Sequence, residues 1–140
     1  MTTEIYSRIF KKLEEIFKMP LKELFEKYGF LKLQAPGFMD LNVDVLSKNR
    51  LSLAHNYIQN GDVMADPDME IEVNFDRQTA EVLSYQDCYG YQTVYVFNEK
   101  GEKVLFYPKT KKDLNIFISQ WLTNIKNQGH IVIEMKGKVA

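Results

Sequence analysis

The segment at residues 65–86, ADPDMEIEVNFDRQTAEVLSYQ, constrains the fold more than any other part of the chain. Polar and apolar residues alternate along its first half. The polar set is Asp68, Glu70, Glu72, Asn74 and Asp76, and the apolar set is Met69, Ile71, Val73 and Phe75. Because successive side chains point to opposite faces of a strand, the pattern predicts a strand with one apolar and one anionic face. A turn at residues 76–78 and a second strand complete the predicted hairpin.

The rest of the chain switches between helical and strand periodicity, which predicts an α+β domain. A length of 140 residues is typical of one domain, so we expect a single domain at residues 1–140. We expect N-terminal helices at residues 1–33 and an antiparallel meander sheet of about five to six strands at residues 38–107. A C-terminal helix at residues 110–129 is expected to pack on one sheet face, and residues 131–135 are a candidate edge strand.

Charge is unevenly distributed along the chain, although the net charge is −1. Residues 34–99 hold three basic and eleven acidic residues, whereas the segments on either side are net basic. Two interpretations stay open. Either the terminal segments fold against the middle and neutralise it, or the protein has two functional surfaces of opposite sign.

The compartment is suggested by what the sequence lacks. Cys88 is the only cysteine, which excludes an internal disulfide framework and is typical of a reducing compartment. No apolar run approaches the roughly 20 residues that cross a bilayer, and the N-terminus lacks the order of a signal peptide. We therefore expect a cytoplasmic protein without membrane contacts.

Catalytic signatures are missing from the sequence. It has no glycine-rich phosphate loop, nucleophile elbow, H-E-x-x-H or C-x-x-C motif. A strand predicted at residues 50–59 places His55 on the same face as Leu51 and Leu53, with no neighbouring partner in the sequence. We expect no catalytic residue and no cofactor.

The carboxylates are the densest group of chemically active side chains. A hard divalent cation takes oxygen ligands, but alternate residues of one strand lie about 6.6 Å apart, so a second strand has to contribute. Asp40 and Asp44, on a strand predicted from residue 38 onward, could contribute if the two strands share a polar face. We assign no metal ligand.

An anionic sheet face also suits a basic protein partner. Regularly spaced carboxylates imitate a nucleic-acid backbone and attract a groove lined by lysine and arginine. The competing explanation is a solvated outer face whose charges prevent aggregation. Direct nucleic-acid binding is not expected, because the chain has few arginines. The predicted partner-binding residues are Asp66, Asp68, Glu70, Glu72 and Asp76.

Two blocks of the sequence resemble a known family. They are LAHNYIQNGDVMADPDMEIEVNFDRQTAEVLSYQ at residues 53–86 and KKDLNIFISQWLTNIKNQGH at residues 111–130, which contains Trp121. The chain resembles an uncharacterised domain family carried by phages, plasmids and conjugative elements of low-GC Gram-positive bacteria. A more remote proteobacterial family of unknown function shares the DPDME-like segment, the A-E-V turn exit and the W-L helix. The resemblance implies a mobile-element accessory protein, and such proteins often disable host defences, as anti-CRISPR and anti-restriction factors do.

We therefore predict a non-enzymatic binding module that presents an acidic strand to a basic protein partner such as a host nuclease. One alternative is a metal-dependent enzyme that uses the same carboxylates with His55. Another is a structural or assembly homodimer that uses an apolar patch at residues 89–95.

Overall fold

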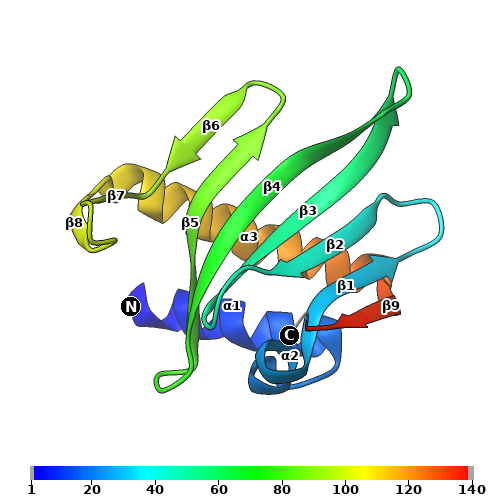
Figure 1. The fold of residues 1–140 in the computed structure, drawn as a ribbon, viewed down its shortest axis with the longest axis horizontal. Helices are drawn as coiled ribbons and strands as arrows, with labels where there is room; N and C mark the ends of the chain where they lie inside the picture. Colours follow the sequence, from blue (N-terminus) through cyan, green and yellow to red (C-terminus); the bar gives the residue numbers. More distant parts are fainter. Residues whose placement is uncertain (1, 139–140) are drawn as a thin grey trace.

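The computed structural model describes residues 2–138, apart from the side chains of residues 2, 3, 56–59 and 62–66. The fold is α+β, as predicted, and its centre is an antiparallel sheet of seven strands in the order β6-β5-β4-β3-β2-β1-β9 (Figure 1). These strands are β1 (Tyr28–Gln34), β2 (Asp40–Val45), β3 (Arg50–Gln59), β4 (Asp62–Asn74), β5 (Thr79–Asp87), β6 (Gly90–Thr93) and β9 (Ile131–Gly137). The strands β7 (Tyr95–Phe97) and β8 (Lys103–Phe106) form a separate two-stranded hairpin.

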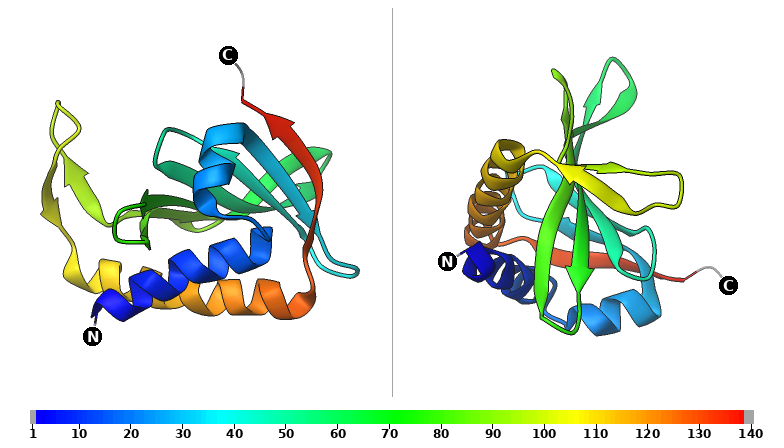
Figure 2. Two further views of the ribbon diagram at one scale, coloured as in Figure 1. Left: turned by 90° about the horizontal axis from the view of Figure 1, so that it is seen from below. Right: turned by 90° about the vertical axis from the view of Figure 1, so that its left-hand side faces the viewer.

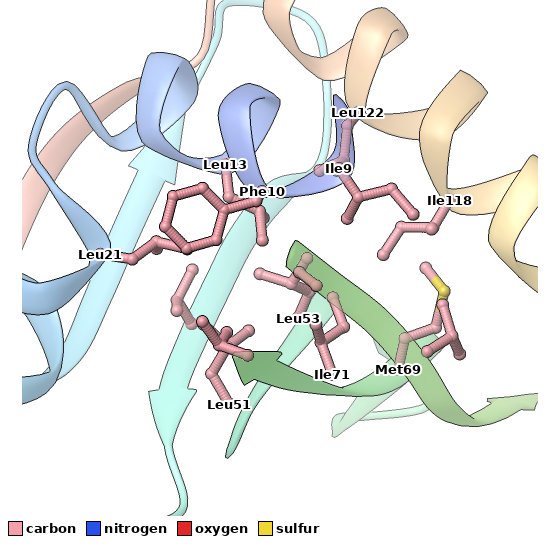
Figure 3. Close-up of a cluster of buried hydrophobic side chains, with 14 of the residues drawn as sticks. Ile9, Phe10, Leu13, Leu21, Leu51, Leu53, Met69, Ile71, Ile118 and Leu122 are labelled. Atoms are coloured by element: carbon pink, nitrogen blue, oxygen red, sulfur yellow. The ribbon is translucent and has the colours of Figure 1, made fainter. Parts of the chain in front are cut away.

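Two long helices cover one face of the sheet, namely α1 (Thr2–Phe17) and α3 (Pro108–Gln128) (Figure 2). Both are amphipathic, and their apolar sides meet the apolar sides of the strands. The core between the layers includes Ile9 and Leu13 of α1, Ile118 and Leu122 of α3, and Leu53 and Ile71 of the sheet, all with no exposed surface (Figure 3). The predicted packing of the C-terminal helix on one sheet face is confirmed.

The short helix α2 (Leu21–Lys27) connects α1 to the sheet. Its Phe25 ring meets the ring of Phe75 edge to face, with 5.3 Å between the centroids. Phe75 follows directly after β4, so this contact fixes one end of the predicted acidic hairpin against the N-terminal helices.

Several predicted boundaries were wrong. The N-terminal helical segment ends at Lys27 rather than at residue 33, because residues 28–34 form the unpredicted strand β1. The C-terminal helix begins at Pro108, two residues before the predicted start. Within the predicted meander at residues 38–107, the strands β6 and β7 belong to different sheets. The candidate edge strand at residues 131–135 is present as β9.

The β7–β8 hairpin projects on the side of the sheet opposite the long helices (Figure 2). It is therefore the element that approaches the second face of the sheet, which we call the open face. No helix in the described part of the chain is both long and apolar enough to cross a membrane.

Candidate functional site

The acidic residues of β4 lie on the open face. Met69, Ile71 and Val73 are buried under the helices, so the alternating side chains of Asp68, Glu70 and Glu72 point the other way. Neither α1 nor α3 covers these carboxylates, which are partly exposed. In the register of the sheet, Glu70 lies between Ser52 of β3 and Ser84 of β5.

We call Asp68, Glu70 and Glu72 the acidic row. Arg50 neutralises part of it. It is the cross-strand partner of Glu72, and its Nη2 atom lies 3.4 Å from Glu72 Oε2. Its Nη1 atom lies 3.7 Å from Glu70 Oε1. The Arg50 guanidinium also stacks over the ring of Phe97, 5.3 Å from the centroid. One arginine therefore compensates two of the predicted partner-binding carboxylates.

A second base reaches the row from the β7–β8 hairpin. Lys103 Nζ lies 2.6 Å from Glu72 Oε1 and 3.2 Å from Glu81 Oε1. The Tyr95 hydroxyl donates a 2.6 Å hydrogen bond to Glu81, and burial together with this bond raises the pKa of Tyr95. Lys111 of α3 lies 3.7 Å from the other carboxylate oxygen of Glu81. These contacts form a continuous charge network toward the β5 side of the open face.

Asp44 and Asp68 lie outside this network. Asp44 is opposite Ser52 on β3, and Asp68 is opposite Ala54 on the same strand, so only two small side chains separate them. Among the described side chains, neither carboxylate has an ion-pair partner within 4.0 Å. Burial raises the pKa of both groups. The charge of Asp44 raises the pKa of Asp68 further, whereas Lys136 partly offsets the effect at Asp44.

The other predicted residues are not all part of this arrangement. Asp76 is exposed in the turn between β4 and β5, beyond the end of the strand. The side chain of Asp66 lies outside the described residues. Asp40 shares the open face, as anticipated, but it pairs with Lys32 at 3.6 Å and accepts a hydrogen bond from Gln34. The structure thus brings together Asp68, Glu70 and Glu72 of the predicted set.

His55 lies on the helix-covered face and not beside the carboxylates. It is buried, and its ring meets Trp121 edge to face with 5.0 Å between the centroids. Its Nδ1 atom donates to the backbone oxygen of Asp40 at 3.0 Å, and burial lowers the pKa of His55. The alternative that combines His55 with the acidic row was therefore wrong in its geometry. In the described part of the chain, no three His, Cys, Asp or Glu side chains are placed to hold a metal ion.

The apolar patch predicted at residues 89–95 is not continuous. Tyr89 and Tyr91 are exposed, but Tyr95 is buried beneath the charge network. The tyrosines thus belong to two different parts of the molecule, and they do not form one surface for dimerisation.

Sequence reasoning missed Arg50 and Lys103 as members of the site. The alternation of β3 contained a signal for Arg50, since this residue has the opposite parity to the buried Leu51 and Leu53. Lys103 lies 31 positions from Glu72 and approaches it only through the folding of the hairpin, so no local pattern indicated the contact.

The comparisons with known proteins identify the family without an activity. A family model described as a domain of unknown function (DUF6908) matches residues 4–131. No curated protein and no solved structure matches the chain. The match contains nothing about phages or plasmids, so the mobile-element setting stays a prediction.

Proposed function

The chain belongs to a family of domains of unknown function (DUF6908), and from this premise we propose that it is a non-enzymatic module whose open face binds a basic protein segment. The pair Asp44 and Asp68 is the observation that supports the proposal most directly. Asp68 is partly buried and Asp44 is exposed, and they lie on either side of β3. The charge of Asp44 raises the pKa of Asp68, and no described cation forms an ion pair with either carboxylate. An arginine or lysine from a partner would provide the missing positive charge.

The compensated carboxylates have a different role in this proposal. Glu70 and Glu72 are held by Arg50 and Lys103, so they form a fixed polar frame around the two aspartates. Preorganised polar groups favour one partner geometry, because few side chains have to be ordered on binding. The site therefore centres on Asp44 and Asp68 rather than on the whole acidic strand.

A host nuclease is the partner class that we propose. Such enzymes have grooves lined by lysine and arginine that attract phosphates largely through charge, and an anionic protein surface is attracted in the same way. The family resemblance to mobile-element proteins favours an inhibitor of a host defence nuclease, of the anti-CRISPR or anti-restriction type. Binding of this kind weakens as the salt concentration rises.

The test is affinity capture from a host lysate at low and high salt, with mass spectrometry of the retained proteins. The baits are the wild-type chain, the double variant Asp44→Asn/Asp68→Asn, and the control Glu26→Gln/Glu99→Gln. The control removes the same charge from two exposed carboxylates. We expect a basic nuclease on the wild-type and control baits, lost at high salt and absent from the aspartate variant. Equal capture by all three baits would exclude the two aspartates as the site.

A further inference from the structure

The edge strand β9 has a free side. It pairs with β1 and ends the seven-stranded sheet, so its outward backbone groups face no other strand of the described chain. It contains seven residues, whereas the opposite edge strand β6 contains four. Short edge strands are one of the means by which proteins prevent intermolecular pairing, and β9 lacks this protection. A register shift against β1 makes Ile133 an extra residue, so the regular part of β9 is residues 134–137.

Large apolar side chains accompany the free backbone of β9. Ile131, Ile133 and Met135 have exposed fractions of 53%, 49% and 49%. A long edge strand that exposes apolar side chains is a template for another strand. The surface of β9 is therefore suited to β-sheet extension, and its charges indicate which strand would be added.

The two charged residues of β9 are complementary to themselves. Glu134 and Lys136 are both exposed and have opposite signs, and within one copy they lie 3.5 Å apart as an exposed ion pair. Such a pair contributes little in water, so both side chains are able to exchange partners. If two copies of β9 pair antiparallel about Met135, Glu134 lies opposite Lys136 of the second copy, and Lys136 lies opposite its Glu134. Opposite charges directly across two strands stabilise the pairing.

We propose that two copies of this chain join through β9 in the register centred on Met135, which extends the sheet across a two-fold axis. A shift of this centre by one residue in either direction places Glu134 opposite Glu134, or Lys136 opposite Lys136. Like charges directly opposite one another destabilise strand pairing. The charges on β9 thus favour the register centred on Met135. They also favour a second copy of β9 as the partner, because a two-fold symmetric interface uses the same surface of both copies.

The decisive test uses two charge-reversed variants, Glu134→Lys and Lys136→Glu. Each variant alone would face like charges in both cross-strand pairs, so we expect a dimer dissociation constant roughly tenfold higher than that of the wild-type chain. Mixed together, the two variants restore opposite charges in both pairs and should form a heterodimer. Sedimentation velocity from low micromolar to near-millimolar concentration measures the monomer–dimer equilibrium of the wild-type chain, of each variant and of the mixture. A general loss of folding cannot produce recovery on mixing.

Hydrogen exchange provides the second readout. The backbone amides of β9 should exchange more slowly as the concentration of wild-type protein rises, whereas the amides of β6 should not change. A wild-type chain that remains monomeric over the whole range would overturn the proposal. So would a dimer whose affinity is the same in both variants and in their mixture.

Discussion

Lys103 Nζ lies 2.6 Å from Glu72 Oε1, and this contact joins the β7–β8 hairpin to the open face of the seven-stranded sheet. The same ammonium lies over the ring of Tyr95, 4.2 Å from the centroid, and also reaches Glu81. A two-stranded hairpin is only marginally stable by itself in water. The contacts of Lys103, together with the Arg50–Phe97 and Tyr95–Glu81 contacts, therefore hold β7–β8 on the sheet.

The first prediction follows from these contacts. Lys103→Met leaves two partly buried carboxylates without their shared base, so the free energy of unfolding should fall by about 1–2 kcal/mol. The amides of β8 should also exchange faster with solvent. Lys109→Met is the matched control, because Lys109 pairs with Asp113 on an exposed helix surface, where an ion pair contributes little. Urea denaturation measures both variants, and equal losses would contradict the structural role of Lys103.

The second prediction concerns Asp68 and the direction of its pH dependence. The pKa of Asp68 is raised above 3.8 in the folded protein, so the folded state binds a proton more readily than the unfolded state does. The ionised carboxylate thus disfavours folding at neutral pH and has no such effect well below pH 3.8. Asp68→Asn should increase the free energy of unfolding at pH 7 by less than about 1 kcal/mol, because the carboxylate is partly exposed and solvent screens its charge.

This gain should shrink as the pH falls through the raised pKa of the folded protein toward 3.8, and it should be absent well below 3.8. Thermal unfolding at several pH values would show it. Asp76→Asn is the control, because Asp76 is exposed in the turn, and it should leave the free energy of unfolding at pH 7 unchanged. If Asp68→Asn stabilises the chain and also abolishes capture of the partner, the carboxylate is retained for binding at the expense of stability. A loss of stability at pH 7 would contradict the electrostatic account of this residue.

The sequence was sufficient to predict the fold class and the two-faced character of β4. Both depend on local periodicity, which the alternation around Glu70 expresses clearly. The strand β1 was missed because Tyr28 extends the apolar stripe of α2 and Gly29 is typical of a helix end. In the structure, Tyr28 is already extended, with φ −122° and ψ 150°.

The partner of Glu72 depends on a bulge that the sequence does not reveal. Near the turn, Gln59 pairs with Asp62, and counting from this pair places Arg50 opposite Ile71. A register shift between Ala54 and Asn56 moves Arg50 by one position, so that it pairs with Glu72. Because a one-residue shift exchanges the two faces of a strand, the ion pairs of the acidic row follow from this bulge.

The third prediction uses the lowered pKa of His55. Burial disfavours the charged ring, so the folded state binds a proton less readily than the unfolded state, in which the pKa is near 6.5. The pH-dependent contribution of His55 to the free energy of unfolding is therefore fully present above pH 6.5. It should be lost as the pH falls from 6.5 toward the pKa of His55 in the folded protein. His55→Asn keeps a donor for the backbone oxygen of Asp40 but does not titrate.

The variant should lose packing against Trp121, and its stability should depend less on pH between 7.5 and about 5 than that of the wild-type chain. Chemical denaturation at each pH gives the slope, and comparison of slopes removes the constant packing loss. Identical slopes would show that His55 does not titrate differently on folding.

The fourth prediction concerns the part of β5 that β6 does not cover. β6 pairs with residues 84–87, so the amide of Val82 has no strand partner on that side. Asn115 of α3 is 1% exposed, and its Oδ1 atom accepts the hydrogen bond of Val82 N–H at 2.9 Å. Its Nδ2 atom donates to the backbone oxygen of Lys111 at 2.7 Å. The buried side-chain amide of Asn115 thus hydrogen-bonds one backbone group of the strand and one of its own helix.

Asn115→Ala removes the acceptor and leaves a buried N–H group without a partner, so the free energy of unfolding should fall by about 1–3 kcal/mol. The amide of Val82 should exchange faster with solvent than in the wild-type chain. Gln120→Ala on the exposed side of α3 is the control, because it tests only helix propensity and one exposed hydrogen bond to Asn124. If the two variants lose similar stability and Val82 stays protected, another group satisfies that amide and the side chain of Asn115 does not hold α3 against β5.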